Sequence, residues 1–107
     1  DRFQLSHAFN NLIKNAVEAV SNIPNPSIKI EYIKKPNNII VYIIDNGTGV
    51  DSKIIRKLFE PYYTTKDKGT GLGLSIVKKI IDDHNGTIKI EKNINLSGST
   101  VTLKFNY

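Results

Sequence analysis

The spacing of apolar residues is the strongest constraint on the fold of this chain, because it is typical of helices in some segments and of strands in others. From residue 1 to about residue 22 these residues recur every three or four positions, as in an amphipathic helix. A second long helix is expected over 71–84, ended by Asn85-Gly86. Four segments have the pattern of strands: 28–33, 39–45, 87–92 and 99–105.

Between the second and third expected strands, the sequence predicts a further short helix and a long loop. Residues 51–58 predict a short helix, and residues 59–70 combine Pro61, Gly69, charges and hydroxyls, as in a long loop. Helices with one apolar face beside mainly antiparallel strands predict an α+β fold, a two-layer sandwich. We expect a mixed, mostly antiparallel sheet covered on one face by about three helices, in a single domain over residues 1–107.

Composition excludes several classes of function. The net charge is +5, but no basic cluster is interleaved with aromatic residues, so we expect no nucleic-acid partner. The chain has no cysteine, which excludes disulfides and thiolate chemistry. The longest apolar run, at 39–44, is far shorter than the roughly 20 residues that a membrane-crossing helix needs. With no signal-peptide pattern either, we expect a soluble, cytoplasmic domain.

Two glycine-rich segments, DNGTGV at 45–50 and KGTGLGL at 68–74, indicate a ligand site. Clustered glycines let the backbone approach a polyphosphate closely and expose N–H groups to it. The second segment opens the helix at 71–84, and a helix N-terminus favours anions. We therefore expect a nucleotide site in which Asp45 binds the base and this helix faces the phosphates.

Each of these signals has a simpler interpretation. Asp45 ends an apolar strand, where its carboxylate needs a donor such as an adenine amine, but Asn46-Gly47 is also an ordinary turn sequence. The segment 68–74 has neither the spacing of a dinucleotide-binding fingerprint nor the Gly-Lys-Ser/Thr of a Walker A sequence. It could serve as a hinge, which is compatible with phosphate binding because a closing loop must move.

The first helix carries polar residues opposite its apolar stripe. Asn11 and Asn15 lie four positions apart and share a face with Lys14 and Glu18. Two amide oxygens one turn apart can contribute to a Mg²⁺ site, although a solvated polar face is the simpler alternative. We expect neither His7 nor His84 to be catalytic: one precedes this face and the other ends its helix. Thr64 and Thr65 could contact phosphate or stabilise loop turns.

Taken in order, five motifs resemble the N, G1, F, G2 and G3 boxes of the ATP-binding catalytic domain of bacterial sensor histidine kinases. They are NLIKNAVEA at 11–19, DNGTGV at 45–50, LFEPYYTTK at 58–66, GTGLGL at 69–74 and GST at 98–100. Their order and spacing match across nearly the whole chain, and EPYYTTKDKGTGLGLSIVKKI is most similar to the nitrogen-regulation (NtrB/NtrY) subgroup. The family fold is the Bergerat sandwich of the GHKL superfamily, which includes gyrase-type ATPases and Hsp90.

The resemblance implies a role for each matched position. Asn11 and Asn15 would be the catalytic positions, with Asn15 coordinating Mg²⁺ and Asn11 and Lys14 near the phosphates of ATP. Asp45 would bond the adenine amine. The other residues on the adenine side would be Gly47, Gly49, Thr100 and the apolar wall candidates Ile44, Val50 and Ile54.

A lid over the phosphates is also implied. Phe59 would anchor this lid, and we expect residues 59–70 to become ordered when ATP and Mg²⁺ bind. The residues around the phosphate tail would be Thr65, Lys66, Gly69, Thr70, Gly71, Leu72, Gly73 and Leu74.

One position separates kinases from ATPases in this superfamily. Gyrase-like members have a general-base Glu four residues before the metal-binding Asn, and here that residue is Asn11, which cannot accept a proton. The resemblance therefore implies transfer to a histidine on a dimerisation domain outside this chain, with a response regulator downstream. We expect an excised domain, monomeric alone and part of a homodimeric kinase whose full length could be membrane-anchored. The alternatives are a nucleotide-sensing module and an anti-sigma-type serine kinase.

Overall fold

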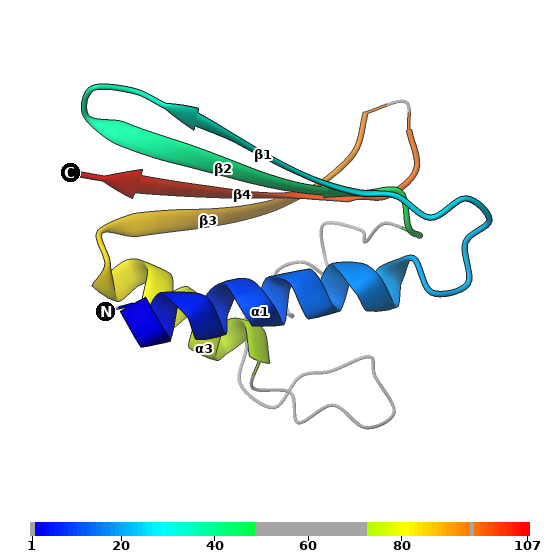
Figure 1. The fold of residues 1–107 in the computed structure, drawn as a ribbon, viewed down its shortest axis with the longest axis horizontal. Helices are drawn as coiled ribbons and strands as arrows, with labels where there is room; N and C mark the ends of the chain where they lie inside the picture. The colour runs from blue at the N-terminus through cyan, green and yellow to red at the C-terminus, as the bar shows by residue number, and fades with distance from the viewer. Residues whose placement is uncertain (1, 49–72, 95) are drawn as a thin grey trace.

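The computed structural model describes residues 2–48, 73–94 and 96–107. Within them the chain forms two helices and four strands. In chain order they are α1 (Arg2–Ala19), β1 (Ile28–Lys34), β2 (Asn38–Asp45), α3 (Gly73–Asp83), β3 (Gly86–Lys92) and β4 (Ser99–Asn106). Both helices lie on the same side of the sheet (Figure 1), so the predicted α+β sandwich, covered on one face, is confirmed.

The sheet has the strand order β1-β2-β4-β3, and every described pair is antiparallel. Directly opposite residues share a face, so the register also divides the side chains between the two faces. Ile43 pairs with Val101, and Val41 pairs with Leu103, all on the side of the helices. Ile44 pairs with Thr100 on the side without helices.

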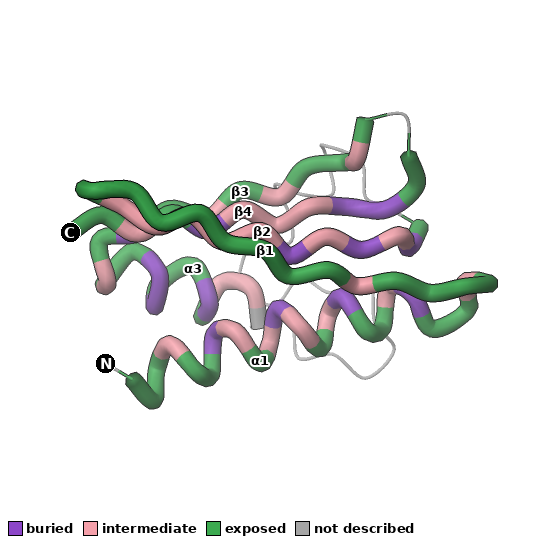
Figure 2. Tube along the Cα trace, turned by 45° about the horizontal axis from the view of Figure 1, so that its top comes forward, coloured by how far each residue is buried: buried purple, intermediate pink, exposed green. Residues whose placement is uncertain are grey.

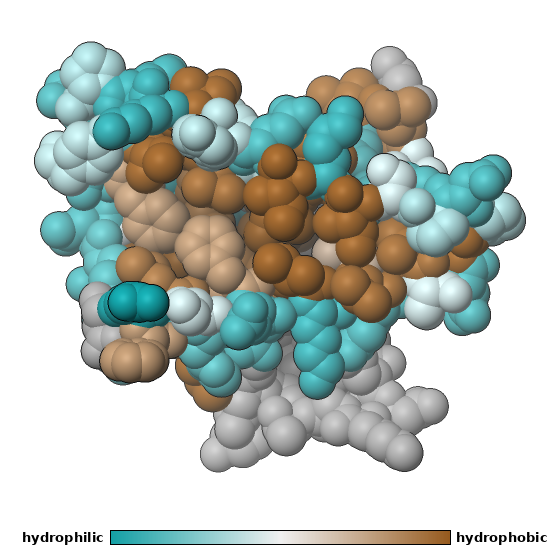
Figure 3. All heavy atoms as spheres, in the orientation of Figure 1, coloured by the Kyte–Doolittle hydropathy of each residue, from teal (hydrophilic) through white to brown (hydrophobic). Residues whose placement is uncertain are grey.

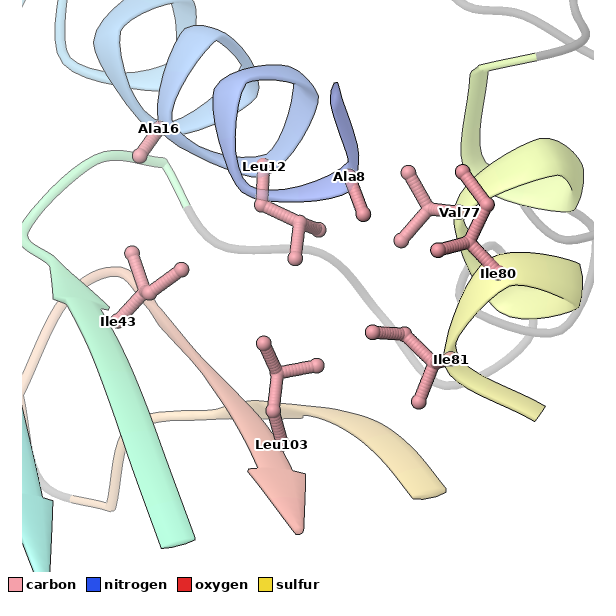
Figure 4. Close-up of a cluster of buried hydrophobic side chains, with 8 residues drawn as sticks. All are labelled: Ala8, Leu12, Ala16, Ile43, Val77, Ile80, Ile81 and Leu103. Atoms are coloured by element: carbon pink, nitrogen blue, oxygen red, sulfur yellow. The ribbon is translucent and has the colours of Figure 1, made fainter. Parts of the chain in front are cut away.

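The core lies between the two helices and the middle strands. Its buried side chains come from α1, β2, α3 and β4 and point toward one another (Figure 4). They are Ala8, Leu12, Ala16, Ile43, Val77, Ile80, Ile81 and Leu103. The three α1 residues are spaced four apart, as the period of an α-helix requires for one buried stripe.

Strand β1 is the exposed edge of this sheet. Its sequence alternates as a half-buried strand should, yet six of its seven residues are exposed (Figure 2). On the helix side Ile30 and Tyr32 keep 54% and 70% of their surface in solvent. The reason is that the two helices pack against each other and, among the strands, α1 packs mainly on β2 and α3 mainly on β3. An apolar band is therefore visible between β1 and α1 (Figure 3).

Helix α3 ends where the sequence predicted. Asn85 adopts a left-handed conformation with φ of 58°, which ends the helix, and β3 begins at the next residue. The Nδ1 atom of His84 lies 2.6 Å from the carbonyl oxygen of Ile80, so this histidine is bonded at the last turn. The short helix predicted over 51–58 and the loop predicted over 59–70 lie outside the described residues.

Candidate functional site

Asp45 lies at the C-terminal end of β2, and its side chain is only 7% exposed. Its Oδ1 atom accepts hydrogen bonds from the backbone N–H of Gly47 at 2.9 Å and of Ser99 at 3.3 Å. No hydrogen bond from the described residues reaches Oδ2. One carboxylate oxygen is thus fixed by the protein, and the other is left as an acceptor for a ligand.

The turn after Asp45 is held against the end of α1. A Cβ on Gly47 would lie 2.4 Å from the carbonyl oxygen of Ala19, so glycine is required here by close packing of two backbones. Asn46 fixes the same turn, because its Oδ1 accepts from Ser27 N at 2.8 Å and its Nδ2 donates to Asn25 O at 2.9 Å. The turn at Asn46-Gly47 is therefore held by specific contacts of the Asn46 side chain and by close packing of the Gly47 backbone.

The start of β4 supplies a neighbour of Asp45, Ser99, which belongs to the GST motif but has no predicted role in the site. The register that pairs Ile44 with Thr100 brings Ser99 beside Asp45, on the helix side of the sheet. Ser99 is buried, and its N–H contacts the carboxylate. The period-two pattern of Val101, Leu103 and Phe105 was the available signal, because Ser99 continues that inward-facing set.

Thr100 and Ile44, both predicted on the adenine side, lie on the other face of the sheet from the Asp45 carboxylate. Thr100 still belongs to the network around Asp45, since its hydroxyl donates to Asn93 Oδ1 at 2.5 Å. Ile44 lines a hollow of about 360 Å³ beneath the β3–β4 turn. The other residues around this hollow are Ser27, Lys29, Asp45, Asn46, Asn93, Leu96 and Ser97.

On α1 the predicted polar face is present. Asn11 and Asn15 are half-buried and Lys14 is exposed. Asn11 Nδ2 donates to the carbonyl oxygen of His7 at 3.0 Å and lies 3.2 Å from His7 Nε2. Because its nitrogen is engaged within the helix, the oxygen of Asn11 is the atom available to a ligand. His7 is thus a direct neighbour of this face, closer than the sequence indicated.

Helix α3 begins at Gly73, at the end of the glycine-rich segment. Its first turn carries N–H groups without partners inside the helix, as every α-helix does. The side chain of Leu74 packs against the core, which fixes the start of the helix. Helix α1 runs toward the end of the sheet that carries Asp45, and α3 runs away from it (Figure 1).

The remaining predicted site positions lie outside the described residues. They are Gly49, Val50, Ile54, Phe59, Thr65, Lys66, Gly69, Thr70, Gly71 and Leu72. The described part of the candidate site therefore consists of Asp45 with Gly47 and Ser99, the polar face of α1 and the first turn of α3. Within this part, no group of three His, Asp or Glu side chains could hold a metal ion.

The whole chain, residues 1–107, matches a family described as histidine kinase-, DNA gyrase B- and HSP90-like ATPases. The chain therefore belongs to this ATPase family, as the five motifs predicted. It is 41% identical over 95 residues to the nitrogen regulation protein NtrY of Azorhizobium caulinodans, covering 84% of this chain and 12% of that protein. It is 40% identical over 104 residues to sporulation kinase B of Bacillus subtilis, covering 97% of this chain and 24% of the kinase.

Solved structures agree with this assignment. The nucleotide-free catalytic domain of histidine kinase ThkA superposes with a TM-score of 0.85 at 36% identity, covering 99% of this chain and 69% of that domain. The chain is thus the ATPase domain of the histidine-kinase type, and it spans less than a quarter of the two curated relatives named above. Within the described ranges, neither helix has the length and hydropathy that crossing a membrane requires.

Proposed function

We propose that this chain binds Mg-ATP as the catalytic domain of a two-component sensor histidine kinase and donates the γ-phosphate to a histidine on an adjacent dimerisation domain. The observation that carries the proposal is the geometry of Asp45, with Oδ1 held by two backbone N–H groups and Oδ2 without a partner among the described residues. A buried carboxylate with one free oxygen suits a ligand that brings its own donor.

Adenine fits this requirement because its exocyclic amine donates hydrogen bonds. A guanine would place a carbonyl oxygen at the equivalent position and repel the carboxylate. Ser99 is buried beside Asp45, and its backbone N–H holds the carboxylate in place for the base. We infer that Asp45 selects adenine, with Gly47 allowing the turn that follows Asp45 to pack closely on the end of α1.

The polar face of α1 suits a hydrated Mg²⁺ and a phosphate chain. When it is bound, Mg²⁺ supplies positive charge that neutralises the phosphate oxygens. Asn15 would provide a protein oxygen, with Asn11 and Lys14 beside it, and phosphates and water would complete the coordination. The first turn of α3, beginning at Gly73, would present N–H groups to the anion.

Transfer rather than hydrolysis follows from the residue types on α1. Asn11 offers no base that could activate water, and its nitrogen is engaged by His7. We therefore expect ATP to be held for an outside nucleophile, the histidine of the dimerisation domain of the same protein, with a response regulator as the later acceptor. Relatives whose names contain the words histidine kinase support a histidine as the acceptor. We place the chain in the cytoplasm, where ATP is available, as part of a homodimer.

A transfer experiment tests the kinase proposal. The chain is mixed with the histidine-bearing domain and ATP labelled on the γ-phosphate, and we expect acid-labile, alkali-stable label on that domain. A His-to-Gln version of the domain should take no label, and a His7→Gln chain should transfer normally. Rapid hydrolysis by the chain alone, or label on His7 or His84, would instead favour an autonomous ATPase or a self-modifying enzyme.

Replacing Asn15 by Ala should weaken ATP binding in the presence of Mg²⁺ more than in its absence. The change removes one oxygen ligand and leaves the contacts to the base intact, so the expected loss with metal is about tenfold. Calorimetric titrations with Mg²⁺ and with EDTA provide the comparison, and Gln4→Ala on the same helix serves as a control. Equal losses under both conditions would mean that Asn15 has a structural role only.

A further inference from the structure

The side chain of Asn93 attaches the β3–β4 turn to the end of β2. Its Nδ2 donates to the carbonyl oxygen of Asp45 at 3.0 Å and to that of Ser97 at 3.1 Å. Its Oδ1 accepts the hydroxyl hydrogen bond from Thr100. Its backbone N–H donates to Gly98 O at 3.0 Å, so both ends of the side chain and the backbone are engaged.

The surroundings of Asn93 require an amide in this one orientation. Two carbonyl oxygens face the nitrogen, and one hydroxyl faces the oxygen. Exchanging the two ends would bring an oxygen against two carbonyl oxygens, and a carboxylate would do the same. Asn93 is also half-buried, so the lost contacts would not be fully replaced by water.

These bonds determine where the N–H of Ser99 lies. Gly98 sits directly over Asp45, with φ of 99°, and Ser99 follows it with its N–H on Asp45 Oδ1. A further bond, from Ser97 Oγ to Asn46 O at 3.3 Å, attaches the same turn to the residue that follows Asp45. If the turn lifts, the carboxylate loses one of the two N–H groups that orient it, and its Oδ2 is no longer held in a single direction.

We propose that Asn93 is a positioning residue for base recognition: by holding the β3–β4 turn on the backbone of Asp45, it orients the Asp45 carboxylate toward the adenine amine. The inference rests on the proposed function, because it needs Asp45 to contact the base. It assigns a role to a residue between the fourth and fifth motifs, which the sequence comparison alone does not mark.

The test compares ATP with purine riboside triphosphate, which lacks only the 6-amino group. The unaltered chain should bind ATP more tightly than this analogue. Asn93→Ala should lower affinity for ATP by about fivefold while changing that for the analogue by less than about twofold, as expected for loss of one oriented hydrogen bond. A residue that only supported the fold would weaken both nucleotides equally.

The matched control is Asn106→Ala. Asn106 lies at the other end of the same hairpin, where its Nδ2 donates to Asn85 O at 3.2 Å. Its removal should lower the melting temperature only slightly, because one exposed hydrogen bond is lost, and leave the preference for ATP unchanged. Ser97→Ala, which removes one bond of the turn, is the milder variant if Asn93→Ala does not fold, and it should reduce the same preference by a smaller factor.

The outcomes separate the two proposals. Two results would overturn the role of Asn93: equal weakening of both nucleotides by Asn93→Ala, or an equal loss of the preference for ATP in Asn106→Ala. Base recognition by Asp45 would still stand in either case if Asp45→Asn removes that preference. If the unaltered chain binds ATP and the analogue equally and Asp45→Asn changes nothing, base recognition by Asp45 fails, and the role of Asn93 fails with it.

Discussion

Replacing Asp45 by Asn is expected to nearly abolish ATP binding while the chain stays folded. The new amide can keep its oxygen on the N–H groups of Gly47 and Ser99, which Asp45 Oδ1 contacts at 2.9 and 3.3 Å. Its nitrogen then faces the adenine amine, and two donors meet in a site that is nearly closed to water. A mismatch of this kind, nearly closed to water, costs up to about 3 kcal/mol, which corresponds to a loss of affinity of about 150-fold.

Isothermal calorimetry with a non-hydrolysable ATP analogue measures this loss, and circular dichroism checks the fold. Asp82→Asn is the control, because Asp82 is an exposed carboxylate on α3 that pairs with Lys78 at 3.1 Å. That change should leave affinity unaltered, since exposed ion pairs contribute little. A folded Asp45→Asn chain with unchanged affinity would remove Asp45 from the site.

Local patterns predicted the elements of this fold well. The observed ends of α1 and β2 differ from the expected ones by only a few residues. The signals for these elements were the stripe that includes Leu12 and Ala16 and the apolar run of β2. Both signals come from neighbours in sequence, which a periodicity detects directly. The order β1-β2-β4-β3 was not predicted, because pairing between β2 and β4 joins segments about 60 residues apart.

The exposure of β1 shows where such patterns stop being informative. Alternation in residues 28–33 predicts two faces but not whether either face is covered. Coverage depends on where α1 and α3 lie across the sheet, and both lie over the other strands. Ile30 and Tyr32 therefore remain exposed although they face the same side as Ile43 and Val41.

For the site, the sequence predicted the residue types better than their contacts. Asp45 was identified from its position before a turn, and the structure adds the two N–H donors that fix its oxygen. The contacts of Asp45 with Asn93 and Ser99 join positions 48 and 54 residues apart in sequence. No local spacing indicates contacts of that kind, and they become visible only when the register of β4 against β2 is known.

Gly98→Ala is expected to be the most destabilising single-methyl change in the described part of the chain. A Cβ at this position would lie 1.9 Å from the carbonyl oxygen of Asp45 and 2.7 Å from Asn46 Cα, and both of these are backbone atoms. The φ of 99° adds conformational strain for any residue with a side chain. Together these effects should lower the free energy of unfolding by at least about 2 kcal/mol, or the melting temperature by about 10 °C.

Gly86→Ala is the matched control for thermal denaturation. There the new Cβ would meet Ile81 Cγ2 at 2.9 Å and Phe105 Cδ1 at 3.0 Å, which are side-chain atoms that can shift, and a backbone oxygen only at 3.0 Å. We expect a smaller loss of stability and no change in nucleotide preference, because Gly86 lies at the other end of the hairpin from Asp45. Gly98→Ala should also weaken ATP binding, since it lifts Ser99 from the carboxylate. A Gly98→Ala chain as stable as Gly86→Ala would show that the β3–β4 turn is not seated on Asp45 as the structure describes.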